Sequence, residues 1–85
     1  MELTLYTRAG CHLCDEAKAQ LQPLVREFGL ALREVDVDTD PELAARFGEE
    51  VPVVLLDGRK VAKHRLDVKE FRRLLERRQK RSPTR

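Results

Sequence analysis

The 85-residue sequence predicts one α/β domain, a four-stranded mixed sheet with three helices in the order β-α-β-α-β-β-α. Three observations lead to this prediction. Apolar runs flank a long amphipathic segment in the first half of the chain, which is typical of parallel strands joined by a helix. An Asp-Gly pair between two later apolar runs predicts a hairpin. A capped amphipathic segment then predicts a final helix. We expect the domain to span residues 1–81, with residues 82–85 as a frayed tail.

The first half of the chain predicts a strand, a helix and a second strand. The apolar run Leu3–Tyr6 is short enough for a buried strand. Over residues 12–28, apolar side chains recur every three or four positions, which predicts an amphipathic helix. Pro23 inside that pattern predicts a kink. Residues 32–37 predict the second strand, although their alternation is imperfect because Leu32 is out of phase with the two valines.

Capping and turn signals divide the second half of the chain. Asp40 followed by Pro41 predicts the start of a short helix. Asp67, three residues before a glutamate, has the form of a capping box and predicts the start of the last helix. The resulting elements are a helix over 41–47, strands over 51–56 and 60–63 around the Asp57-Gly58 turn, and a helix from 68 to about 79.

Two cysteines lie where the first strand gives way to the first helix. Cys11 is at or just before the first helical turn, where unpaired backbone N–H groups and the helix dipole favour a thiolate. Residues three apart share one face of a helix, so Cys14 can reach Cys11 and close a disulfide. The pattern therefore predicts a redox pair in which the exposed Cys11 attacks and the partly buried Cys14 resolves.

Other interpretations of the cysteines have less support. Two small buried hydrophobic residues would not need to stand at a helix start. A structural zinc ion would need Cys11 and Cys14 with His12 and His64, whereas zinc sites usually show two pairs of closely spaced ligands. We expect no resident metal or cofactor.

Four stretches of the chain match one known family: Tyr6–Cys14, Val35–Asp38, the Val51-Pro52 pair and the Asp57-Gly58 turn. On these residues the chain resembles the glutaredoxin branch of the thioredoxin fold, over nearly its whole length. More narrowly, it looks like the short bacterial glutaredoxin-like proteins with a C-x-L-C site. The resemblance implies a thiol–disulfide oxidoreductase that acts on a protein disulfide or a low-molecular-weight thiol, with a thioredoxin-type reductant as a further partner.

The resemblance also implies roles for residues outside the cysteine pair. Glutaredoxins have a basic residue near position 8, so Arg8 is expected to stabilise the Cys11 thiolate. Independently of the resemblance, His12 is expected to assist when it is protonated, because a histidine changes its charge near neutral pH. Pro52 is implied to be cis, which turns the Val51 backbone groups toward the site for pairing with an extended substrate. Asp67 is implied to cap the helix start that receives the γ-glutamyl carboxylate of glutathione.

The sequence departs from the family where glutaredoxins carry a Gly-Gly pair that lets glutathione approach. This chain has Lys63-His64-Arg65-Leu66-Asp67 there, with no glycine. Because larger, positive side chains occupy the space, we expect weak or absent glutathione dependence. An iron–sulfur cluster bridging two chains stays an alternative, because some glutaredoxins bind one.

The net charge of +2 conceals an asymmetry along the chain. Residues 72–85 carry a net charge of +6, and residues 1–71 carry −4. The basic C-terminal helix is an alternative docking surface for a partner, but it lacks interleaved aromatic residues, so nucleic acid is not favoured. No apolar run approaches the ~20 residues that span a bilayer. Without a basic leader segment, we expect a cytoplasmic monomer that does not bind membranes.

Overall fold

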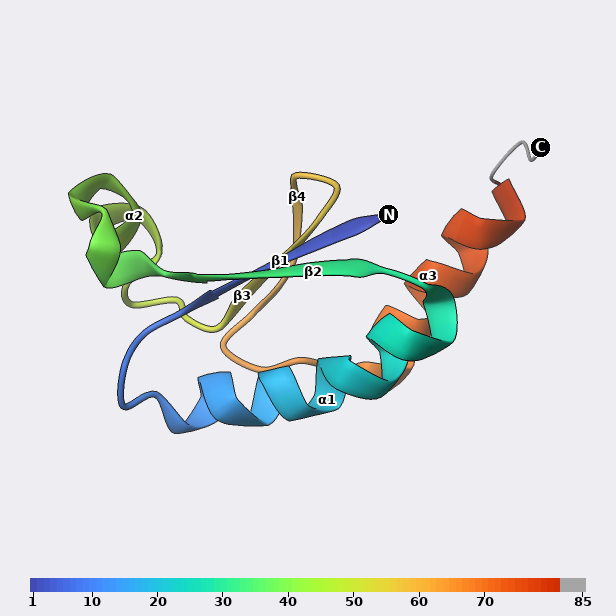
Figure 1. The fold of residues 1–85 in the computed structure, drawn as a ribbon, viewed down its shortest axis with the longest axis horizontal. Helices are drawn as coiled ribbons and strands as arrows, with labels where there is room; N and C mark the ends of the chain where they lie inside the picture. The colour runs from blue at the N-terminus through green and yellow to red at the C-terminus, as the bar shows by residue number, and fades with distance from the viewer. Residues whose placement is uncertain (82–85) are drawn as a thin grey trace.

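A computed structural model describes residues 1–81, and these form the predicted succession of elements (Figure 1). The predicted tail over residues 82–85 lies outside the described part of the chain. Within residues 1–81, no helix combines the length and the apolar character that a membrane crossing requires. The elements are β1 (Glu2–Thr7), α1 (His12–Phe28), β2 (Ala31–Asp36), the 3-10 turn η1 (Val37–Thr39), α2 (Pro41–Phe47), β3 (Val53–Leu56), β4 (Arg59–Lys63) and α3 (Val68–Arg81).

The four strands form one sheet in the spatial order β2-β1-β3-β4. The strand β1 runs parallel to β2 and antiparallel to β3, and β3 runs antiparallel to β4. Asp57 and Gly58 both have positive φ, at 50° and 84°, which is the type I′ pattern of a two-residue hairpin. The mixed sheet and its hairpin are therefore as the sequence predicts.

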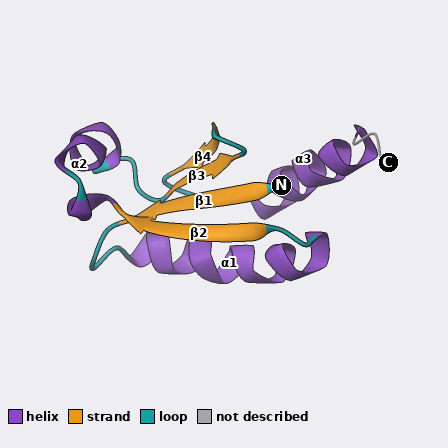
Figure 2. Ribbon diagram, turned by 45° about the horizontal axis from the view of Figure 1, so that its top comes forward, coloured by secondary structure: helices purple, strands orange, loops and turns teal. Residues whose placement is uncertain are grey.

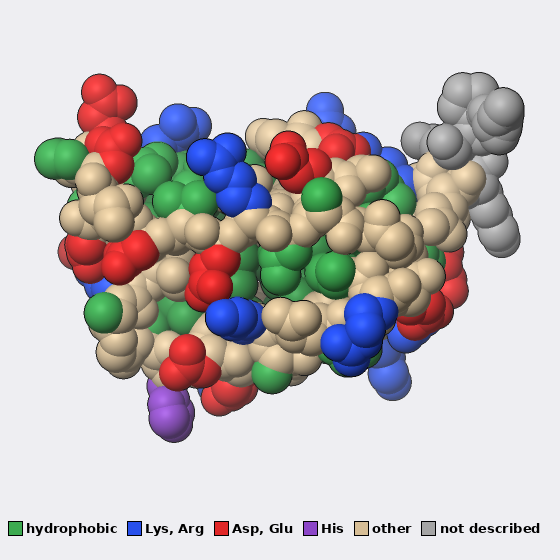
Figure 3. Space-filling view, viewed as in Figure 1, with side chains coloured by type: hydrophobic (Ala, Val, Ile, Leu, Met, Phe, Trp, Pro, Cys, Tyr) green, Lys and Arg blue, Asp and Glu red, His purple; other side chains and the backbone are tan. Residues whose placement is uncertain are grey.

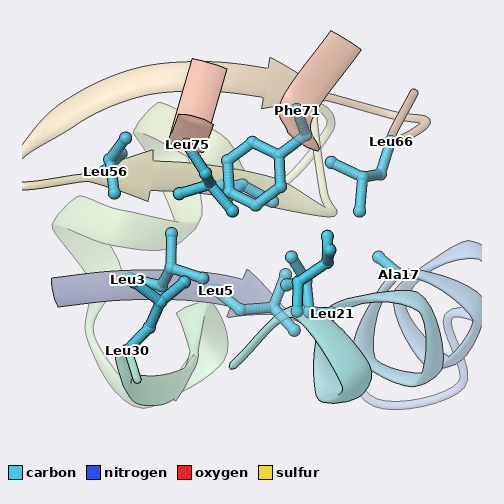
Figure 4. Packing of buried hydrophobic residues seen from close by; sticks show 11 residues of the cluster. Leu3, Leu5, Ala17, Leu21, Leu30, Leu56, Leu66, Phe71 and Leu75 are labelled. Carbon is cyan, nitrogen blue, oxygen red and sulfur yellow. The ribbon is translucent and has the colours of Figure 1, made fainter. Parts of the chain in front are cut away.

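The main core lies between one face of the sheet and the helices α1 and α3 (Figures 2 and 4). Alternate residues of β1 point into it, because successive side chains of a strand face opposite sides. Figure 4 shows Phe71 and Leu75 of α3 pointing toward side chains from β1 and α1. The core residues are Leu3, Leu5, Ala17, Leu21, Leu24, Leu30, Val54, Leu56, Leu66, Phe71 and Leu75.

A smaller core covers the other face of the sheet at the end where β1 stops. Val37, Phe47 and Val53 are buried there, and the rings of Tyr6 and Phe47 stack with centroids 4.7 Å apart. Leu43 of α2 packs against the same cluster. The short helix α2 is thus fastened to the end of the sheet from which the first helix departs (Figure 1).

Most strand boundaries differ from the prediction by one residue, and two of the differences, at the end of β2 and the start of β3, bear on the site. The strand β2 ends at Asp36, because the Asp36 side chain accepts the backbone N–H of Asp38 and starts the turn η1. Val37 therefore leaves the strand and is buried in the smaller core. The strand β3 begins at Val53 rather than at residue 51, so the Val51-Pro52 pair precedes the strand. The helix α1 continues through the exposed Pro23.

Candidate active site

The turn that carries Cys11 is closed by its own backbone. The N–H of Cys11 donates to the carbonyl oxygen of Arg8 at 3.2 Å. Gly10, the third residue of this turn, has φ of +76°, a conformation that a type II turn requires and that side chains rarely adopt. A Cβ added at Gly10 would have no neighbour within 4 Å, so there is room for a side chain. Glycine is favoured here because of the positive φ. We refer to residues 8–11 as the cysteine turn.

Cys11 and Cys14 form a disulfide, with their Cα atoms 5.2 Å apart. Cys11 occupies the N-cap position of α1, and its Sγ accepts the backbone N–H of Cys14 at 3.1 Å. Cys14 is only 3% exposed, whereas Cys11 is half-buried. The shared helix face predicted for the two sulfurs is confirmed, and Cys11 is the more accessible of the pair.

The Val51–Pro52 bond is cis, as the resemblance implied. Pro52 is buried and directly precedes β3, whose first residue Val53 pairs with Tyr6 near the end of β1. The proline therefore lies at the end of the sheet from which the cysteine turn leaves. Val51 is half-buried and packs on the smaller core. Their predicted roles in substrate binding stay predictions.

The Arg8 guanidinium makes three hydrogen bonds to two partner residues. Its Nε and Nη2 atoms donate to the two carboxylate oxygens of Asp38, each at 3.0 Å, and its Nη1 donates to the carbonyl oxygen of Gly48 at 3.0 Å. The pKa of the Arg8 guanidinium is raised, first by the hydrogen bond and charge of Asp38, then by the charges of Glu49 and Asp36. The sequence analysis missed Asp38 and Gly48 as site residues, although Asp38 belongs to a stretch that matches the family.

The remaining predicted residues lie around the start of α1. His12 is exposed at the first position of that helix. Beside Cys14, a cavity of about 380 Å³ is bordered by three carboxylates, those of Asp15, Glu34 and Asp36. Across the described residues, no cluster of three or more His, Cys, Asp or Glu side chains is placed to hold a metal ion.

The segment that replaces the family glycines has an unusual backbone. His64 has φ of +65°, and the N–H of Arg65 donates to the carbonyl oxygen of Lys63 at 2.7 Å, which closes a γ-turn around His64. The N–H of His64 donates to the carbonyl oxygens of Glu50 and Pro52, at 3.1 and 2.9 Å. This segment therefore supports the stretch that leads to the cis proline.

The side chains of that segment face the first turns of α1. A cavity of about 90 Å³ is lined by Leu13 and Glu16 of α1 together with His64, Arg65 and Leu66. Its small volume agrees with the expectation that larger side chains fill the place of the glycines. Asp67 accepts the N–H of Glu70 at 3.1 Å, which confirms its capping position at α3.

The family model described as a glutaredoxin-like domain (DUF836) matches residues 2–76. This chain belongs to the glutaredoxin-like family. A glutaredoxin-like protein of Dictyostelium discoideum is 30% identical over 73 residues, which cover 79% of this chain and 68% of that protein. An uncharacterized protein of Mycobacterium tuberculosis is 43% identical over 75 residues, which cover 76% of this chain and 77% of the relative.

Solved structures agree with this assignment. A structural genomics target protein from X. campestris is 36% identical to this glutaredoxin-like protein, with a TM-score of 0.71 over 88% of this chain and 96% of that one. The structural match to thioredoxin 1 of Thermosipho africanus covers 99% of this chain and 100% of that one, with a TM-score of 0.74 and 19% sequence identity. The latter likeness shows the thioredoxin-like fold alone.

Proposed function

We propose that this glutaredoxin-like protein is a thiol–disulfide oxidoreductase that depends weakly or not at all on glutathione. The observation that carries the proposal is the Cys11–Cys14 disulfide at the start of α1. The accessible sulfur of Cys11 receives a backbone N–H, and the second sulfur is buried one turn away. A hydrogen bond to sulfur favours the charged form, which is the attacking form of a thiol.

The reaction moves two electrons from the dithiol to a substrate disulfide. The Cys11 thiolate attacks one substrate sulfur, forms a mixed disulfide and releases the other substrate sulfur as a thiolate, which takes up a proton. Cys14, after losing its proton, attacks the Cys11 sulfur and releases the second substrate thiolate. The protein is left with the Cys11–Cys14 disulfide, and a dithiol reductant of the thioredoxin type returns the two electrons.

The weak dependence on glutathione is supported by the segment that lies against α1. His64 and Arg65 line a cavity of about 90 Å³, too small for a tripeptide. The cavity of about 380 Å³ beside Cys14 is bordered by three carboxylates and by Arg8, and Lys18 pairs with Glu34 at 3.0 Å. The carboxylates outnumber these two cations, so the lining favours the carboxylates of glutathione less than a basic lining would. A protein disulfide flanked by neutral or basic residues is better matched to the carboxylates around this cavity.

The order of the two cysteines is tested with single substitutions. We expect Cys14→Ser to retain attack and accumulate a stable mixed disulfide with a peptide disulfide substrate, because no resolving thiol remains. We expect Cys11→Ser to form none. Limiting iodoacetamide applied to the reduced wild-type protein should label Cys11 first. Preferential labelling of Cys14, or a mixed disulfide in Cys11→Ser, would overturn the assignment.

The glutathione prediction is tested by comparing reductants on one peptide disulfide. We expect slow turnover when glutathione is the reductant and faster turnover with a thioredoxin system, with an ordinary dithiol glutaredoxin as the control. Turnover comparable to that glutaredoxin at matched glutathione would show that the missing glycines do not matter. Visible absorption in freshly purified protein would instead favour the iron–sulfur alternative.

A further inference from the structure

The candidate active site is built from two segments far apart in the sequence. One is the cysteine turn, residues 8–11, and the other is the proline segment, residues 48–52, which leads from the end of α2 to β3. A substrate that forms a mixed disulfide with Cys11 while pairing with the Val51 backbone must touch both segments. Its reaction therefore depends on the distance between them.

One side chain joins these segments directly. Arg8 belongs to the cysteine turn, and its Nη1 donates to the carbonyl oxygen of Gly48, the first residue of the proline segment. Asp38 holds the same guanidinium through two further bonds of 3.0 Å. Two parallel bonds between a guanidinium and a carboxylate fix its plane, which a single charge contact does not do.

The close packing around Gly48 supports a specific contact with the Arg8 guanidinium. Gly48 is buried with ordinary helical backbone angles, so its conformation does not demand glycine. A Cβ added there would lie 2.6 Å from Nη2 of Arg8 and would also collide with the carbonyl oxygen of Ala44. The missing side chain therefore leaves room for two neighbours, the backbone carbonyl of Ala44, which is the nearer of the two, and the guanidinium of Arg8. We call Arg8, Asp38 and Gly48 the arginine clamp.

The charges around Arg8 argue against a purely electrostatic role. Asp38 is bound to the guanidinium, and the charges of Asp36 and Glu49 also act on it. Three carboxylates thus offset one positive charge, which leaves little net attraction for the Cys11 thiolate. The arginine clamp therefore fixes the positions of neighbouring segments and adds little net positive charge to the site.

We propose that Arg8 is a positioning residue whose guanidinium, held by Asp38, fixes the cysteine turn against the proline segment. This inference rests on the proposed oxidoreductase function for its effect on turnover. Its geometric part concerns two segments of the fold and is measured without any substrate.

Two substitutions of Arg8 separate geometry from charge. Arg8→Lys keeps the charge but loses the fork of bonds, whereas Arg8→Met loses both. If the arginine clamp acts through geometry, Arg8→Lys and Arg8→Met should both lower kcat/KM for a peptide disulfide by about tenfold and leave the Cys11 pKa unchanged.

If Arg8 acts on Cys11 directly through its charge, only Arg8→Met should lose activity and raise the Cys11 pKa, and Asp38→Asn should lower the Cys11 pKa. The clamp predicts that Asp38→Asn also loses activity, and that it adds little in an Arg8→Met background.

The matched control is Arg72→Lys. Arg72 makes the same kind of forked pair with Glu27, at 2.6 and 2.8 Å, between the C-terminal part of α1 and α3. Its side chain is 40% exposed, against 38% for Arg8. Arg72→Lys should therefore lose about as much overall stability as Arg8→Lys does, but leave kcat/KM at the wild-type value.

Amide hydrogen exchange supplies the second readout. We expect Arg8→Lys to speed exchange in residues 8–11 and 48–52 together, with α3 unchanged. Wild-type turnover together with wild-type protection of these segments in Arg8→Lys would overturn the proposal, as would a raised Cys11 pKa in Arg8→Met alone. If the wild-type protein reduces no disulfide, the proposed function fails, and the exchange data still decide whether the clamp exists.

Discussion

At the scale of single residues, the most unexpected feature is the backbone of His64. A φ of +65° is a left-handed conformation that costs a residue with a Cβ about 1–2 kcal/mol. The surroundings maintain it, because the N–H of His64 is shared between the carbonyl oxygens of Glu50 and Pro52. The position where the family has glycines thus keeps a backbone that suits glycine, although this chain carries a larger side chain there.

We expect His64→Gly to raise the free energy of unfolding by about 1 kcal/mol, because glycine adopts positive φ without a steric cost. Urea unfolding measures the change. The control is Lys63→Gly in the neighbouring strand β4, which should lower the free energy of unfolding by about 0.5–1 kcal/mol. A His64→Gly protein less stable than wild type would show that the side chain contributes more than the backbone costs.

Sequence reasoning found the residues whose chemistry depends on near neighbours and missed those that depend on distant ones. The Cys11–Cys14 pair follows from helical spacing, and it is confirmed. Arg8 was expected beside the thiolate, but its hydrogen-bond partners lie 30 and 40 positions away. No local pattern predicts which of the many acidic residues a guanidinium will reach, because the folding of the sheet decides it.

At the scale of elements, capping and turn chemistry made the prediction accurate. The helix α1 has the predicted bounds, and Asp40 accepts the N–H of Glu42 at 2.9 Å at the start of α2. The end of β2 was harder to predict, because the side chain of Asp36 competes for the backbone and turns Val37 away from the strand. Apolar periodicity alone does not show such competition.

Gly48, at the end of α2, tests the packing of that element. Helix propensity alone predicts that Gly48→Ala raises stability by about 0.5–1 kcal/mol. The collisions of its Cβ with Arg8 and Ala44 predict the opposite, and we expect a loss of about 1–3 kcal/mol in urea unfolding. The loss should shrink in an Arg8→Met background, because one of the two collisions is gone. A more stable Gly48→Ala protein would mean that the guanidinium has room to move.

At the scale of the whole molecule, the basic C-terminal helix is tied to the acidic body. Arg72 pairs with Glu27 of α1, and Arg78 pairs with Asp57 of the hairpin turn at 3.4 Å. On the face shown in Figure 3, acidic and basic side chains are interspersed. The charge asymmetry of the sequence is thus partly offset within the fold, which leaves less positive charge for a partner.

These pairs predict how stability responds to acid. The pKa of Glu27 is lowered from its ordinary value of 4.5, first by the hydrogen bond from Arg72 and also by the charge of Arg72. A carboxylate with a lowered pKa in the folded state contributes stability that is fully present above its unfolded pKa. That contribution is lost as the pH falls through the folded pKa. Below about pH 4.5, we therefore expect wild-type stability to fall more steeply than that of Glu27→Gln.

Urea midpoints measured from neutral pH down to pH 3 test this expectation. The wild-type advantage over Glu27→Gln should be largest near neutral pH and shrink toward pH 3, and added salt should reduce it because both partners are exposed. The control is the same Glu27→Gln substitution in an Arg72→Met background, whose curve should run parallel to that of Arg72→Met alone because the ion pair is already absent. Parallel curves for wild type and Glu27→Gln would instead mean that the Arg72–Glu27 ion pair between α3 and α1 adds nothing to stability in solution.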